Sequence, residues 1–146
     1  MTKEQIYQSL LPQIEALTSG EMDLIANMAN VAAALHSAFG FWWTGFYRVD
    51  GDTLVLAPFQ GTVACVRIPY GRGVCGTAWQ QDRTVIVPNV HEFAGHIACS
   101  SESKSEIVVP VHKDGKVIAV LDVDSAEFDT FDVIDRTYLE RIVLCL

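Results

Sequence analysis

The chain is short, apolar and acidic. It has 146 residues, of which half are apolar and only 19% are charged, against roughly a quarter charged in an average soluble domain. These values predict one globular domain, residues 1–146, with a large core, and they exclude intrinsic disorder. Ten basic and 18 acidic residues give a net charge of −8. Nucleic acid and anionic membranes are therefore poor candidates for a partner, because both are bound through clustered Lys and Arg.

The N-terminal residues do not resemble a targeting segment. They read MTKEQIYQSLLPQIEAL, without the basic region and continuous apolar run of a secretory signal. No run of apolar residues approaches the length needed to span a bilayer. We therefore expect a cytoplasmic protein. Its four cysteines are then expected to be reactive, metal-bound or buried, because static disulfides are rare in the cytosol.

The periodicity of apolar residues changes along the chain and predicts an α+β fold. Helical spacing is found at residues 3–17, 21–39, 74–81 and 131–146, and strand-like runs at 41–49, 53–58, 62–68, 84–87, 105–112 and 116–124. Residues 89–104 have no stable period and are expected to form a long, functional loop. The order of these elements predicts a central antiparallel sheet of about six strands, with the N- and C-terminal helices on one face. Apolar stripes on the helices leave room for a homodimer.

Two aspartates near the end of the last strand are the first candidates for a site. Asp122 and Asp124 are two residues apart, so both side chains point to one face of the sheet. Whether Glu106 joins them depends on the preceding hairpin. A two-residue loop would pair Lys113 with Lys116 and place Glu106 on the opposite face. A three-residue loop would place Glu106 directly across from Asp122, and we favour this loop. The residues alone leave a converging carboxylate site and a solvated sheet end with turn-capping aspartates equally open.

Three converging carboxylates would have a definite chemistry. Their mutual repulsion should raise the pKa of at least one, leaving a protonated acid beside carboxylates that can hold a cation. Such a set suits a zwitterionic substrate with a proton-accepting oxygen. Trp43 and Tyr47 share one face of the first strand and form either an aromatic wall for an ammonium or small apolar group, or part of the core.

The four cysteines lie in different surroundings. Cys99 lies in the polar loop, where a thiol is accessible to reaction, and Cys75 lies close to Arg72 and the start of a short helix, which would favour a thiolate. Cys65 lies in a strand-like apolar run, and Cys145 on the core stripe of the last helix, where burial is expected. The chain has no C-x2-C or H-x3-H pair, so no metal site is predicted.

Four segments, in this order and spacing, resemble the free methionine-(R)-sulfoxide reductases, a family of stand-alone GAF-domain enzymes. They are FWWTGFYRVDG (41–51), GRGVCGTAW (71–79), CSSESKSEIVVPV (99–111) and VLDVDS (120–125). The resemblance extends over essentially the whole chain. It implies a GAF-like fold with an enclosed small-molecule pocket on the sheet face opposite the terminal helices. It also implies reduction of free, not peptide-bound, methionine-(R)-sulfoxide, with no bound cofactor and with thioredoxin or another dithiol as reductant.

The resemblance also implies a role for each candidate residue. Cys99 corresponds to the nucleophile that attacks the sulfoxide sulfur, Cys65 to the usual resolving thiol, and Cys75 to a second or auxiliary thiol. Trp43 corresponds to the aromatic residue on the S-methyl group, with Tyr47 on the same wall, and the acidic substrate site corresponds to Glu106, Asp122 and Asp124. Two other functions stay open from the sequence: a non-catalytic GAF sensor and a redox thiol switch.

Overall fold

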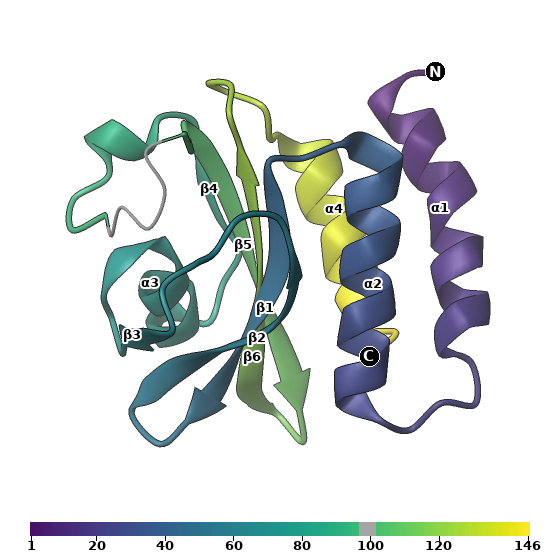
Figure 1. Ribbon diagram of the computed structural model, residues 1–146, viewed down its shortest axis with the longest axis horizontal. Helices are drawn as coiled ribbons and strands as arrows, with labels where there is room; N and C mark the ends of the chain where they lie inside the picture. Colours follow the sequence, from purple (N-terminus) through teal and green to yellow (C-terminus); the bar gives the residue numbers. More distant parts are fainter. Residues whose placement is uncertain (97–101) are drawn as a thin grey trace.

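The computed structural model describes residues 1–96 and 102–146. The chain folds into four α-helices, one short 3-10 helix and six strands (Figure 1). The helices are α1 (Lys3–Thr18), α2 (Leu24–Phe39), α3 (Gly73–Gln81) and α4 (Val133–Val143), with η1 (Val90–Glu92) as the 3-10 turn. The strands are β1 (Trp43–Asp50), β2 (Thr53–Gln60), β3 (Arg67–Pro69), β4 (Val85–Val87), β5 (Ser105–Lys113) and β6 (Lys116–Ser125).

The six strands form one antiparallel sheet in the order β3-β2-β1-β6-β5-β4. Helices α1, α2 and α4 cover one face, and α3 lies on the other (Figure 1). This confirms the α+β architecture and the placement of the terminal helices. Within the described residues, no helix is long and apolar enough to cross a membrane.

Alternation along the central strands separates a core face from a pocket face. Phe46 of β1 and Leu121 and Val123 of β6 are fully buried against the three helices. Trp43 and Tyr47 lie on the other face of β1 and belong to a second buried cluster, which includes residues of α3. Because side chains alternate along a strand, burial of one set beneath the helices fixes the other set toward α3.

A buried polar network fastens the outermost helix α1 to α4. The Tyr7 hydroxyl donates to Asp135 Oδ1 at 2.6 Å, and Lys3 Nζ lies 2.6 Å from Asp135 Oδ2. Asp135 is completely buried, and these two donors satisfy its carboxylate. The helical layer that supports the sheet is therefore held by specific bonds as well as by apolar packing.

The predicted strand over residues 62–68 is wrong for most of its length, because only Arg67–Pro69 forms a strand beside β2, next to one further backbone bond from Leu56 N–H to the Val66 carbonyl. Two of the residues before it bond to side chains of β1 instead. The Thr62 carbonyl accepts from Trp43 Nε1 at 3.0 Å, and the Cys65 carbonyl accepts from the Tyr47 hydroxyl at 2.9 Å. Cys65 therefore lies in an irregular segment that crosses the pocket face, and not in a strand.

The predicted three-residue hairpin loop is also wrong. Lys113 pairs with Lys116, so the loop is Asp114-Gly115, with both residues at positive φ (53° and 77°) as a type I′ turn requires. A bulge then shifts the register, since Val111 pairs with Ala119 but the next residue pairs with Val117. A two-residue loop alone would turn Glu106 to the face opposite Asp122 and Asp124. The extra residue in β6 returns it to their face.

The bulge has a direct consequence for the acidic residues. Glu106 lies directly across from Asp124, and not from Asp122 as predicted. All three carboxylates still share one face. At the C-terminus, α4 ends at Val143, earlier than expected, so Cys145 lies just beyond the helix and is half-buried rather than in the core.

Candidate active site

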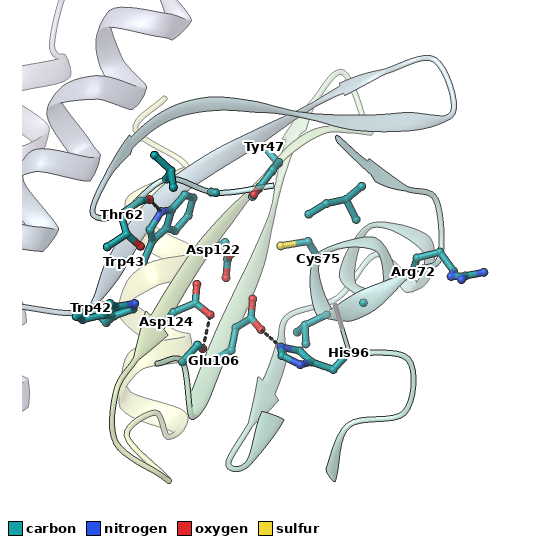
Figure 2. Close-up of a pocket in the computed structure, with 16 residues that line it drawn as sticks. Trp42, Trp43, Tyr47, Thr62, Arg72, Cys75, His96, Glu106, Asp122 and Asp124 are labelled. Atoms are coloured by element: carbon teal, nitrogen blue, oxygen red, sulfur yellow. Dashed lines mark hydrogen bonds and ion pairs between the residues drawn. The ribbon is translucent and has the colours of Figure 1, made fainter. Parts of the chain in front are cut away.

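A pocket lies on the sheet face opposite the three-helix layer, between β1, β6, β5 and the start of α3 (Figure 2). Six of the eight predicted site residues line it: Trp43, Tyr47, Cys75, Glu106, Asp122 and Asp124. The lining residues are Trp42, Trp43, Tyr47, Thr62, Val63, Ala64, Ile68, Arg72, Gly73, Val74, Cys75, His96, Ser103, Glu106, Asp122 and Asp124.

The floor of the pocket carries the three predicted carboxylates. Glu106 and Asp122 are each only 6% exposed, and Asp124 is half-buried. Ser103 Oγ donates to Asp124 Oδ1 at 2.9 Å, and His96 Nε2 lies 4.0 Å from Glu106 Oε1. Asp122 Oδ1 is buried and has no hydrogen-bond partner among the described residues. A buried carboxylate oxygen without a partner is costly, which favours a ligand with a donor at this point.

The three carboxylates have raised pKa values, but not for identical reasons. Burial, followed by the charges of Asp122 and Asp124, raises the pKa of Glu106 well above the ordinary range. Burial and the charge of Asp122 do the same to the pKa of Asp124, although the hydrogen bond from Ser103 partly offsets the effect. Burial also raises the pKa of Asp122, but its contacts with Glu106, Asp124 and Cys75 partly offset the effect. Asp122 is therefore the one of the three that keeps its charge most readily.

An aromatic wall stands beside the carboxylates. Trp43 stacks on Phe59 of β2, with ring centroids 5.1 Å apart, and on Tyr47 at 6.0 Å. Gly45 makes room for this arrangement, because a Cβ atom there would lie 2.3 Å from Phe59 Cβ and 2.8 Å from the Trp43 ring. Both Trp43 and Tyr47 are buried, so each contributes to the core and to the pocket at once.

Cys75 lies in the first turn of α3 with its sulfur directed toward Asp122 (Figure 2). The expectation that this site favours a thiolate is wrong. Burial, followed by the charges of Asp122 and Glu106, raises the pKa of the Cys75 thiol well above its usual value. Arg72 is exposed and points away from the sulfur (Figure 2), so it does not offset the carboxylates. Cys75 is consequently a protonated thiol at neutral pH.

The structure separates the other cysteines. Cys99 lies outside the described residues. The backbone of Cys65 is fixed next to the pocket by the Tyr47 hydroxyl, at 2.9 Å, whereas Cys145 packs at the edge of the helical layer on the opposite face of the sheet. Cys145 is thus remote from the candidate site.

Two pocket residues have contacts that sequence reasoning did not anticipate. Ser103 orients Asp124, and His96 lies beside Glu106. Neither belongs to a periodic element, since both lie in the connection between β4 and β5. The polar, Ser- and His-containing composition of that connection was the one available signal.

Comparison with known proteins places this geometry in a family. Residues 18–143 match the GAF domain family. The chain is 61% identical to GAF domain-containing protein A of Dictyostelium discoideum (99% of this chain, 92% of the relative). It is 45% identical to the free methionine-R-sulfoxide reductase of Escherichia coli (98% and 87%). The structure of free methionine-R-sulfoxide reductase from Neisseria meningitidis, in complex with its substrate, superposes with a TM-score of 0.97 at 52% identity (99% and 88%). The chain therefore belongs to the GAF domain family and, within it, to the free methionine-R-sulfoxide reductases.

Proposed function

We propose that the protein reduces free methionine-(R)-sulfoxide to methionine. The observation that carries this proposal is the set of three carboxylates, two buried and one half-buried, that faces an aromatic wall in one pocket. A free amino acid sulfoxide has an ammonium group, a carboxylate, a basic sulfoxide oxygen and an apolar S-methyl group. The pocket of a protein in this family offers a complementary group for each of them.

The charged ends of the substrate have separate partners. The ammonium group binds Asp122, whose Oδ1 is buried without a partner and which keeps its charge most readily of the three acids. The carboxylate binds at the N-terminus of α3, where the first N–H groups of a helix have no intrahelical acceptor and Arg72 supplies no side-chain cap. The S-methyl group rests on Trp43.

The sulfoxide oxygen requires a proton. Glu106 and Asp124 are the acids with pKa values well above the ordinary range, so one of them is protonated at neutral pH and donates to this oxygen. Glu106→Gln and Asp124→Asn each remove one donor. The variant with the larger loss of kcat, about 10²–10⁴-fold for a general acid, identifies the donor.

Cys99 then attacks the sulfoxide sulfur. The oxygen passes to the cysteine as a sulfenic acid while methionine leaves, so that sulfur of the substrate is reduced and Cys99 is oxidised. Cys65 condenses with the sulfenic acid, which releases water and forms a disulfide. A dithiol such as thioredoxin supplies the two electrons and two protons that restore both thiols. Cys75 stays protonated and serves as the auxiliary thiol.

The test is the consumption of each methionine sulfoxide epimer, with dithiothreitol or with thioredoxin as reductant. We expect turnover of the R epimer by the wild type and none by Cys99→Ser. Cys145→Ser is the matched control, because it removes a thiol on the opposite side of the sheet, and it should keep full turnover. Binding of the R epimer without turnover would instead indicate a sensor. Equal turnover of an N- and C-blocked methionine sulfoxide would contradict the roles given to the charged ends.

A further inference from the structure

We propose that Cys75, Glu106 and Asp122 form a binding site for Zn²⁺ on the floor of the pocket. One ligand atom from each of these residues, the Cys75 sulfur and one oxygen of each carboxylate, lies within 4.8 Å of the other two. All three residues are buried. They come from α3, β5 and β6, which explains why no chelating spacing is visible in the sequence.

One atom in this cluster points to a ligand independently of the cluster itself. Asp122 is 94% buried, its exposure being 6%, and its Oδ1 has no hydrogen-bond partner among the described residues. Figure 2 shows the Asp122 carboxylate, the Cys75 sulfur and the Glu106 carboxylate directed toward one another in the pocket. A cation at this position would satisfy the oxygen that the protein leaves unpaired.

The donor set favours zinc over the more abundant divalent cations. Zn²⁺ takes four ligands from thiolate, imidazole and carboxylate groups, whereas Mg²⁺ and Ca²⁺ require six or more oxygen ligands. His96 lies 4.0 Å from Glu106 Oε1 and is the candidate for the fourth ligand, alongside water. On binding, the Cys75 thiol, and the Glu106 carboxyl where it holds a proton, release their protons to solvent as the bonds to zinc form.

The local charge also favours a cation. His96, beside Glu106, is the sole ion-pair partner that the described part of the chain offers to the three carboxylates. The nearby Lys104 is engaged elsewhere, because its Nζ lies 5.3 Å from the centre of the Phe128 ring. Zn²⁺ would therefore enter a site whose negative charge has little protein compensation.

The assay must separate Cys75 from the other thiols. Cys65 and Cys99 would also bind zinc when reduced, so the experiment uses the full chain with both changed to serine. In that background, Cys75→Ser and Cys145→Ser form a matched pair with one remaining thiol each. Zn²⁺ affinity is measured by competition with a chromophoric chelator, and Co²⁺ reports thiolate ligation through its sulfur-to-metal charge-transfer band.

We expect the Cys145→Ser protein to bind an equimolar amount of Zn²⁺ and to show the cobalt band. Cys75→Ser should lose the band, and its zinc affinity should fall at least about tenfold. Removing even a residue that only hydrogen-bonds to a metal ligand lowers affinity by that factor. Asp122→Asn in the same background should also weaken binding and keeps a side chain of equal size. The proposal is overturned if the band persists without Cys75, if neither protein binds zinc, or if Mg²⁺ competes as well as Zn²⁺.

A consequence for catalysis rests on the proposed function. If Asp122 holds the substrate ammonium, Zn²⁺ and methionine-(R)-sulfoxide exclude each other, and the substrate should raise the apparent Kd for zinc in the Cys145→Ser protein. Methionine-(S)-sulfoxide at the same concentration is the control. Zinc binding that the R epimer does not weaken would contradict the placement of the substrate, while the substrate-free titration would still establish the zinc site.

Discussion

Neutralising Glu106 should make the protein more stable at neutral pH, although it removes a group proposed to act in the reaction. Glu106 is buried beside two other carboxylates, and its pKa is raised well above the ordinary range by burial and then by the charges of Asp122 and Asp124. In the unfolded chain the same residue titrates near its ordinary pKa of about 4.3. The folded state therefore binds a proton that the unfolded state has released.

The sign and size of the effect follow from this difference. Between the ordinary pKa and the raised one, the folded state binds more protons, so the free energy of unfolding falls as pH rises. A single group contributes at most about 1.4 kcal/mol per pH unit in this window. Glu106→Gln removes that contribution. From pH 5 to pH 7, the stability of the variant relative to wild type should therefore rise by up to about 2.7 kcal/mol.

Urea unfolding at several pH values, followed by tryptophan fluorescence, measures this difference. Glu92→Gln is the matched control, because Glu92 is an exposed glutamate on the 3-10 turn, and its difference from wild type should stay nearly constant. If the Glu106→Gln difference is equally flat between pH 5 and pH 7, Glu106 is not protonated in the folded state. The assignment of a proton donor to this side chain would then be wrong.

Two further substitutions test the packing that supports the pocket. Tyr7→Phe removes the hydroxyl that donates to the buried Asp135 at 2.6 Å, so urea unfolding should show a loss of about 1.5–3 kcal/mol, the range for a hydrogen bond to a charged group; a loss below about 0.5 kcal/mol would show that the bond adds little. Gly45→Ala places a methyl group 2.3 Å from Phe59 Cβ and 2.8 Å from the Trp43 ring, which should cost about 1–3 kcal/mol and raise KM for the sulfoxide through displacement of Trp43. An unchanged KM and stability would contradict the close packing of this wall.

The local elements were largely predictable because their causes are local. Apolar spacing and the Ser19-Gly20 break locate α1, and α2 ends where predicted, at a glycine with φ of 65°. Its start was predicted three residues too early, at residue 21. Asp23 sets the actual start, because its side chain accepts from the Ala26 N–H and caps the helix.

The register of the β5–β6 hairpin was not predictable in the same way. Its two strands are apolar on both faces, so the pattern of hydrophobic residues does not distinguish one register from another. The Asp114-Gly115 pair correctly indicates a two-residue turn, but that turn without a bulge would place Glu106 beneath the helices. The bulge in β6 decides the face of Glu106, and no residue type in KVIAVLDVD marks it.

The protonation of Cys75 shows why the chemistry of the site depends on tertiary structure. Its sequence neighbours, an arginine and a helix start, favour a thiolate, but the arginine is exposed and directed away from the sulfur (Figure 2). Asp122 and Glu106, remote in sequence, reach within 4.8 Å of it in a buried cluster. Charges at that distance outweigh a helix terminus in a water-poor site. Asp122 and Glu106 therefore keep Cys75 protonated, which disfavours Cys75 as a nucleophilic thiolate.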